Sequence, residues 1–218
     1  MFDDVEYMPY LQDTKGICHI LQKNWMKKEE PLTQVSLERR LSQRDRHIIE
    51  AKSLKSSAVL VPIVKKPAGL ELLFTKRTET VEHHKGQISF PGGAANETDR
   101  SPADTALRES SEEIGLDRSA VTILGMMDDL QTPSGFIVTP VVGFIEQLPL
   151  LTINSDEVAE VIFIPMKLFF DDRKKRSKII ELEGNKREVY FFDVWKEPVW
   201  GATAFFVKQL VDLVRIPQ

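Results

Sequence analysis

The sequence predicts a layered fold of the α/β or α+β class, in which helices pack on a mixed β-sheet. Short β-like runs recur along most of the chain, and strongly patterned helices stand apart among them. The chain has 218 residues, of which 42% are hydrophobic and 28% charged, an ordinary globular composition. Since this length lies somewhat above that of a typical domain, we expect one domain at residues 35–218, preceded by an extension at residues 1–34 of unclear role.

Secondary-structure elements can be assigned in order along the chain. Residues 1–34 lack clear periodicity and form either an arm packed on the domain or an interaction segment. Ser36 can cap a charged helix that runs to Glu50. Two strands, at residues 58–64 and 70–75, are joined by the turn sequence K-K-P-A-G and predict a hairpin. Further β-like runs and a closing amphipathic helix lie at residues 121–127, 136–145, 158–164, 189–193 and 203–214.

Residues 102–114 form the most clearly marked helix. Ser101 is a good N-cap, Pro102 suits the first helical position, and Asp104 stands where a capping-box acid belongs. Gly115 is a natural left-handed stop. One face of the helix carries small and apolar side chains and is expected to pack on the sheet: Ala103, Ala106, Leu107, Ser110 and Ile114.

Three glutamates share one flank of this helix. Glu109, Glu112 and Glu113 are spaced i, i+3 and i+4, so their carboxylates repel one another, and they also lie at the negative end of the helix dipole. Both penalties reverse when a divalent cation binds, and carboxylate oxygens suit Mg²⁺ or Mn²⁺. The cluster is therefore either a cation site or a solvated acidic helix end.

The sequence around this helix resembles the Nudix box, G-x5-E-x7-R-E-U-x-E-E-x-G-U, in which U is aliphatic. Its second half matches R-E-S-S-E-E-I-G-L at residues 108–116, with Ser110 in place of the first aliphatic residue. The first half is one residue longer than the pattern, so that the acid is Asp99 and the glycine is Gly93. The resemblance implies a box at about residues 93–116. It also implies a Nudix-type α/β/α sandwich with a mixed sheet and a carboxylate-bearing helix after a Gly-rich loop.

A second resemblance lies upstream of the box. The segment L-L-F-T-K-R-T-E-T-V-E-H-H-K-G-Q-I-S-F-P-G-G resembles the signature of the coenzyme A pyrophosphatase branch of Nudix hydrolases, with an L-L-T-x-R start, H-x-G and F-P-G-G. It departs from that signature by an inserted Phe74 and by Glu82, where the branch usually has arginine. The similarity spans about residues 57–214 and continues in T-P-S-G-F, D-E-V-A-E-V and V-W-G at residues 132–136, 156–161 and 199–201.

This second resemblance implies hydrolysis of the pyrophosphate bond of coenzyme A or a derivative, giving 3′,5′-ADP and 4′-phosphopantetheine or its acyl form. Mg²⁺ or Mn²⁺ bridging carboxylates and phosphates would neutralise charge and orient the attacking water. Glu109 and Glu113 are expected as the main metal ligands, and Glu112 is either a further ligand or the base that orients water. Arg108 would act in catalysis by orienting Glu109 or a neighbouring acid. Glu157 is a candidate fourth metal carboxylate.

Candidate substrate contacts follow from the same resemblance: Arg77, Lys85, Gly92, Gly93, Phe136 and the basic run at residues 173–178. The two single cations either bind phosphate or are solvated surface charges. The two glycines either let the backbone approach phosphate or the helix closely, or mark a plain turn. The phenylalanine either stacks on adenine or packs in the core. The basic run is expected to be a solvated loop, and the alternative is that it grips the ADP end.

The composition limits the kinds of partner and the cellular location that we expect for the protein. The net charge of −4 lacks the basic excess that duplex binding needs, and the single cysteine, Cys18, indicates no disulfide. The first residues are acidic where a secretory signal is basic, and no apolar run is long enough to span a bilayer. We therefore expect a cytoplasmic enzyme with a small-molecule nucleotide substrate and neither nucleic acid nor membrane as partner. Its oligomeric state stays open, a homodimer included.

Two other functions remain open from the sequence. One is a Nudix pyrophosphatase for another nucleoside diphosphate derivative, such as NADH, ADP-ribose or a nucleotide sugar. The other is a catalytically silent module that binds a nucleotide. The three acids on one helix disfavour the silent module, because like charges at this spacing destabilise a helix that holds no cation.

Overall fold

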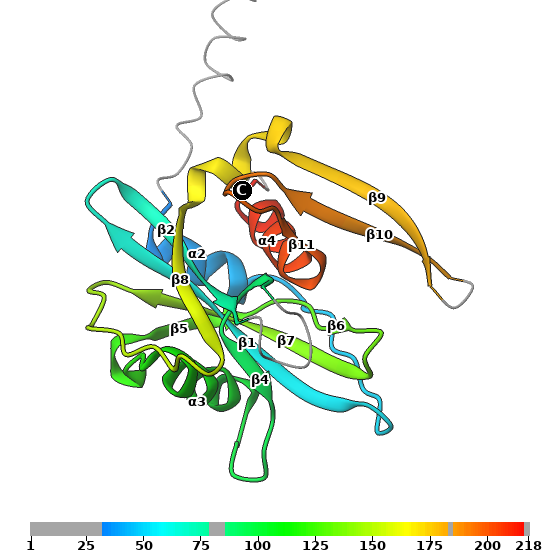
Figure 1. Cartoon of the computed structure of the whole chain (residues 1–218), viewed down its shortest axis with the longest axis horizontal. Helices are drawn as coiled ribbons and strands as arrows, with labels where there is room; N and C mark the ends of the chain where they lie inside the picture. The colour runs from blue at the N-terminus through cyan, green and yellow to red at the C-terminus, as the bar shows by residue number, and fades with distance from the viewer. Residues whose placement is uncertain (1–31, 79–85, 183–184, 216–218) are drawn as a thin grey trace, which may run out of the picture. The chain divides into compact units, whose positions relative to one another are not determined.

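The computed structural model describes residues 32–78, 86–182 and 185–215 (Figure 1). The expectations for residues 1–31 and for Lys85 lie outside this part. From Thr33 onward the chain forms one compact unit. Among the described residues, no helix combines the length and the apolar character that crossing a membrane requires.

A mixed sheet forms the centre of this unit. Within the described residues its strand order is β3-β2-β1-β7-β5, with β4 beside β1, β6 beside β7 and β8 beside β2. The pairing of β1 with β7 is parallel, and the other neighbours are antiparallel. The strands are β1 (Lys55–Lys66), β2 (Gly69–Arg77), β3 (Ile88–Ser89), β4 (Gly92–Ala94), β5 (Thr122–Met126), β6 (Leu130–Gln131), β7 (Phe136–Ile145) and β8 (Val158–Pro165).

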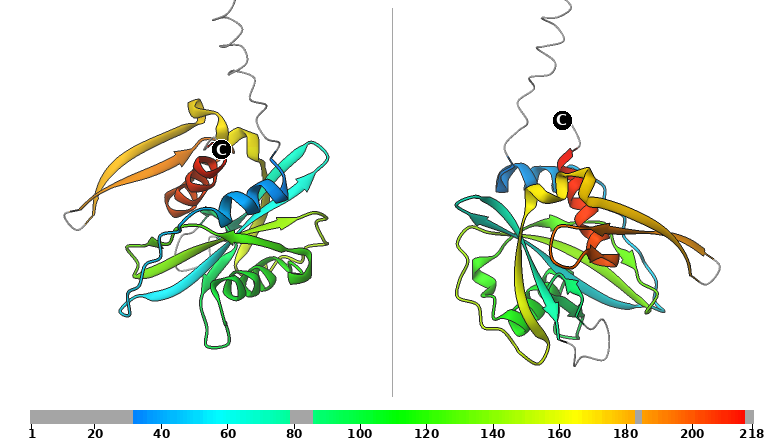
Figure 2. Two further views of the ribbon diagram at one scale, coloured as in Figure 1. Left: turned by 180° about the vertical axis from the view of Figure 1, so that it is seen from behind. Right: turned by 45° about the horizontal axis from the view of Figure 1, so that its top comes forward.

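Helices cover both faces of this sheet, which confirms the predicted α/β/α sandwich. Helix α3 (Pro102–Ile114) lies on one face, and α2 (Gln34–Ser42) and α4 (Gly201–Arg215) lie on the other (Figures 1 and 2). The core under α3 is aliphatic: Ala58, Leu60, Val64, Leu73, Ala106, Ile114, Leu116, Val141, Ile145 and Val158 are all buried. This packing fixes α3 against β1, and so it fixes the glutamates that the helix carries.

A smaller antiparallel sheet, in the order β11-β10-β9, packs beside α4. It consists of β9 (Lys175–Leu182), β10 (Asn185–Phe192) and β11 (Val199–Trp200). The basic run at residues 173–178 was expected to be a loop, which is wrong, because residues 173 and 174 lie in a 3₁₀ helix and residues 175–178 begin β9. Three short 3₁₀ helices complete the described elements: Arg118–Ala120, Met166–Phe170 and Asp172–Lys174.

The first helix differs from its prediction at both ends. Its N-cap is Thr33, whose hydroxyl accepts from the Ser36 N–H at 3.2 Å, while the Ser36 hydroxyl accepts from the Thr33 N–H at 2.9 Å. Ser36 is thus the third helical residue of a reciprocal cap rather than the cap itself. The helix ends at Ser42 rather than Glu50, and in the segment that follows Arg44 donates to Asp128 and Arg46 donates to Asp129.

Candidate active site

The local sequence sets both ends of α3. The Ser101 hydroxyl accepts from the Asp104 N–H at 3.2 Å, and Gly115 adopts the left-handed conformation with φ 64°. Ser110, which stands where the box has an aliphatic residue, is fully buried on the sheet-facing side. Its hydroxyl donates to the Ala106 carbonyl at 2.6 Å, so the buried polar group is satisfied within the helix. The helix therefore tolerates this departure from the box pattern.

The three glutamates of α3 differ in their surroundings. Glu113 is almost completely buried, with 4% of its side chain exposed, and Glu109 is 17% exposed. Glu112 is 57% exposed and accepts a hydrogen bond from Arg108 at 3.1 Å. The structure thus turns Glu109 and Glu113 towards the sheet and leaves Glu112 at the solvent side.

Gly92 and Gly93 allow the sheet to approach these two carboxylates. A Cβ atom at Gly93 would overlap the carboxylate of Glu109. Gly92 has φ +155°, and a Cβ there would lie 2.6 Å from the Cα of Val59 on β1. The Gly92 N–H donates to Glu113. Both glycines are therefore needed for close contact between β4, β1 and the helix.

Glu113 is a buried carboxylate whose hydrogen bonds and neighbouring positive charge do not make up for the loss of solvation. Burial raises its pKa to about 8, although the Arg77 guanidinium and the Gly92 N–H act in the opposite direction. The Arg77 Nη1 lies 3.7 Å from Glu113 Oε1, longer than a hydrogen bond. In the described part of the chain, neither Glu113 Oε2 nor Arg77 Nε has a hydrogen-bond partner, although both are buried. Such orphaned groups at one place indicate a site that is completed by a ligand.

Glu157 contributes a third negative charge to this place. It immediately precedes β8, and its N–H donates to the Asn154 carbonyl at 3.2 Å, which holds the turn before the strand. Its charge raises the pKa of both Glu109 and Glu113. Glu109, Glu113 and Glu157 are therefore electrostatically coupled although they come from two different elements.

Arg108 connects the helix to the preceding loop. Its Nε and Nη2 donate to the two carboxylate oxygens of Asp99 at 3.1 and 2.9 Å, and Nη2 also donates to the Ala94 carbonyl at 2.9 Å. Its Nη1 donates to Glu109 at 2.8 Å. This planar fork fixes Glu109 relative to the end of β4.

The role of Asp99 is not apparent from sequence alone. Its carboxylate accepts from the Asn96 N–H at 3.0 Å and from the Thr105 hydroxyl at 2.9 Å, in addition to Arg108. Hydrogen bonds from Arg108 are the main reason that the pKa of Asp99 lies well below its usual range. Its place as the acid in the first half of the box was the available signal, but only the fold of the loop shows that it reaches Arg108.

Phe136 lies away from the carboxylates. It is the first residue of β7 and pairs with Lys55 on β1, whereas Gly92 pairs with Val59. Four residues of strand separate the two positions, about 13 Å. Phe136 is partly buried, with Lys55 Nζ 5.9 Å from the centre of its ring. It is thus neither a core residue nor a neighbour of the buried acids.

Glu109, Glu113 and Glu157 could bind a divalent cation together only after their side chains move. Within the residues that the structure describes, no three acidic, histidine or cysteine side chains already form a ligand set. Glu109 is held by Arg108, and Glu112 points to solvent. The unpartnered Glu113 oxygen and the repulsion among Glu109, Glu113 and Glu157 are both relieved by a hard cation. These three residues suit Mg²⁺ or Mn²⁺ in their chemistry.

Comparison with known proteins gives a consistent family. The NUDIX domain profile matches residues 54–183, more than half of the chain. A Pectobacterium atrosepticum protein named "Uncharacterized Nudix hydrolase NudL" is 41% identical over 156 residues, covering 72% of this chain and 81% of that protein. A protein of the same name from Photorhabdus laumondii is 34% identical over 178 residues, covering 82% and 90%.

Among solved structures, a Nudix hydrolase from M. smegmatis, RenU, is similar over 52% of this chain and 71% of its own, with 20% identity and a TM-score of 0.45. The profile match and the two relatives, together with the α/β/α sandwich and the box on α3, agree with one another. The chain therefore belongs to the Nudix family and is a pyrophosphohydrolase.

Proposed function

We propose that the chain hydrolyses the pyrophosphate bond of coenzyme A or a derivative, releasing 3′,5′-ADP and 4′-phosphopantetheine or its acyl form, and that residues 35–218 form the catalytic domain. As a Nudix hydrolase the chain acts on a nucleoside diphosphate derivative. The narrower substrate class is supported by the upstream signature, whose last residues lie in β4, the strand that packs on α3.

One observation carries this proposal. Arg77, the arginine of that signature, lies beside the buried Glu113, and its Nε has no hydrogen-bond partner among the described residues. A cation bound to Glu113 would compensate the carboxylate and leave the guanidinium available for a phosphate oxygen, the acceptor that its fork fits best. The signature thus supplies a phosphate contact next to the acids of the box.

The other residues have distinct tasks in the proposed reaction. Glu109, Glu113 and Glu157 hold Mg²⁺ or Mn²⁺, which supplies charge neutralisation on the diphosphate and activation of water. Arg108 keeps Glu109 in position through its fork to Asp99. Glu112, which is exposed and outside the buried set, is the acid that orients the attacking water. Gly92 and Gly93 keep this part of the sheet free of side chains.

A substrate panel tests the proposal. Purified protein with Mg²⁺ or Mn²⁺ is incubated with coenzyme A, acetyl-coenzyme A, NADH and ADP-ribose, and products are identified by mass. We expect 3′,5′-ADP from the coenzyme A compounds. AMP from NADH or ADP-ribose, without 3′,5′-ADP from coenzyme A, would overturn the substrate class in favour of another Nudix pyrophosphatase. Water labelled with ¹⁸O identifies the phosphorus that is attacked.

A further inference from the structure

Two motifs of the sequence have no role in the catalytic site: the V-W-G motif at residues 199–201 and the basic run at residues 173–178. The small sheet brings them together. Phe191 on β10 pairs with Trp200 on β11 and with Arg176 on β9. Since directly opposed residues of antiparallel strands point to the same face, these three side chains form a row across the sheet, called here the aromatic row.

The two rings of the aromatic row are stacked nearly parallel. The rings of Phe191 and Trp200 are 6.0 Å apart at an angle of 9°, and the Arg176 guanidinium lies 4.3 Å from the centre of the Phe191 ring. Asp193 fixes that guanidinium by accepting from its Nε and Nη2 at 2.9 and 3.2 Å. Trp200 nevertheless remains 41% exposed. The row is held in place at the Arg176 end and open at the Trp200 end.

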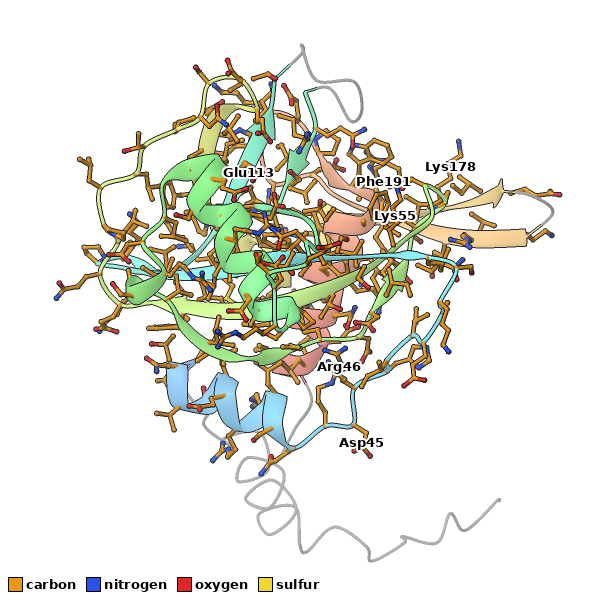
Figure 3. The ribbon with its side chains drawn as sticks, turned by 90° about the horizontal axis from the view of Figure 1, so that it is seen from below. Asp45, Arg46, Lys55, Glu113, Lys178 and Phe191 are labelled. Carbon is orange, nitrogen blue, oxygen red and sulfur yellow. The ribbon has the colours of Figure 1, made fainter. Side chains whose placement is uncertain are left out.

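The aromatic row faces away from α4. The neighbouring residue Tyr190 points to the opposite face, where Lys208 of α4 lies 5.3 Å from its ring. Arg187, on the same face as Phe191, donates to the Gln131 carbonyl of β6 at 3.3 Å. The row therefore lies on the side of the hairpin that is turned to the main sheet. Lys178 projects from the same face, and Figure 3 labels it together with Phe191.

The chain segment around Trp200 contacts two strands that lead to the catalytic site. Strand β11 packs against β3, and three residues after the end of β3 the chain reaches Gly92. Lys76, next to Arg77 on β2, forms an ion pair at 2.6 Å with Glu197, in the connection that leads into β11. The segment that carries the exposed indole thus contacts β3 and, through Glu197, also β2, the strand of Arg77.

We propose that Trp200, supported by Phe191, is the subsite that stacks on the nucleobase of the substrate. A flat exposed indole offers the surface that a base requires. Lys178, on the same face of the small sheet two residues from Arg176 along β9, supplies a cation for the phosphates that accompany the base. The proposal rests on the proposed function only in assuming a nucleotide substrate, and it concerns the end of the substrate that does not react.

Direct binding tests the subsite independently of catalysis. The probes are 3′,5′-ADP and AMP, with inorganic pyrophosphate as the probe that has no base, titrated calorimetrically into the full chain. Trp200→Leu should raise the Kd of both nucleotides roughly 5- to 150-fold and leave the Kd of pyrophosphate within about twofold. Trp200→Phe should restore most of the affinity. Ile179→Ala, which removes an exposed side chain from the other face of the hairpin, is the matched control and should change nothing.

Kinetics and NMR give further readouts. With any substrate that the chain hydrolyses, Trp200→Leu should raise KM and spare kcat, because the base is remote from the reacting bond. The indole N–H signal that disappears in Trp200→Phe should shift in the wild type when AMP is added, and this measurement holds even if Trp200→Leu does not fold. Unchanged nucleotide Kd values in folded Trp200→Leu, or an unmoved indole signal, would overturn the subsite. Nucleotide binding that depends on Trp200 without cleavage of coenzyme A would refute the proposed substrate and leave the subsite standing.

Discussion

Asp99 and Glu113 are two carboxylates at opposite ends of the box, and they are almost equally withdrawn from solvent, with 6% and 4% of their side chains exposed. Asp99 receives hydrogen bonds from Arg108, Thr105 and the Asn96 N–H, and its pKa is lowered. Glu113 has one oxygen without a hydrogen-bond partner in the described part of the chain, and burial raises its pKa to about 8.

The difference separates structural from reactive acids. A carboxylate with every oxygen paired stabilises the loop that it closes. A buried carboxylate without full compensation destabilises the fold, so it is retained where a ligand supplies the missing charge. Similar burial therefore leads to opposite expectations for the two positions.

Glu113→Gln should have the largest effect. It keeps the shape of the side chain but removes the charge that would hold a cation, and we expect kcat/KM to fall by more than about 100-fold, beyond the usual loss for a residue that only supports a metal ligand. Steady-state hydrolysis with Mn²⁺ measures it. Glu38→Gln, the same change at an exposed position of α2, is the control. Activity within a few-fold of wild type would show that Glu113 does not hold the cation.

Arg108→Lys should come next. Lysine retains the charge but cannot bind both Asp99 oxygens and Glu109 together, so kcat/KM should drop by about 10- to 100-fold. Asp99→Asn should cause a similar drop, and the double variant should lose less than the sum of the two, because both act through one fork. Full additivity in this double-mutant cycle would show that Asp99 does not act through Arg108.

The next largest effect is expected in the pH dependence of the free energy of unfolding, which should differ between Glu113 and Asp99. The folded-state pKa of Glu113 is raised, so its contribution to stability is fully present below the unfolded value of about 4.3 and is lost as the pH rises through about 8. With a chelator present to remove divalent cations, the free energy of unfolding of Glu113→Gln should therefore exceed that of wild type between pH 5 and 9, by on the order of a few kcal/mol. Urea unfolding measures this, and a pH-independent difference would contradict the raised pKa.

Asp99 should show a smaller effect of opposite sign. Its folded-state pKa is lowered, so the stability that it contributes is present above the unfolded value of about 3.9 and declines as the pH falls below it. Asp99→Asn should flatten the acid limb of the stability profile and leave the limb between pH 7 and 9 unchanged. Thermal unfolding from pH 3 to 9 measures both limbs. An acid limb identical to that of wild type would mean that the fork adds no stability.

Sequence predicts the parts of the fold whose signals are local. The bounds of α3 follow from Ser101, Pro102 and Gly115, and the run at residues 136–145 coincides with β7, because caps and apolar runs act on their own segment. Strands β3 and β4 are too short to show a periodicity. Strand β9 escaped prediction because its charged side chains belong to a hairpin that is largely solvated.

The candidate site shows the same limit. A helical wheel places Glu109, Glu112 and Glu113 on one flank, but it cannot show that the sheet buries only two of them, since this depends on how Gly92 and Gly93 approach the helix. The charge coupling to Glu157 depends on where β8 begins. The aromatic row depends on strand pairing across three elements, which no local pattern encodes.

The first half of the box can be one residue longer because both of its ends are fixed by the fold. On one side, Ala94 is hydrogen-bonded into the sheet opposite Ser57; on the other, Ser101 caps α3. The surplus residue falls between these two anchors, where lengthening a surface connection changes the closure entropy only slightly. This stretch can therefore accept insertions during evolution while the acids stay in register, and motif searches that demand a fixed spacing will overlook functional relatives of this kind.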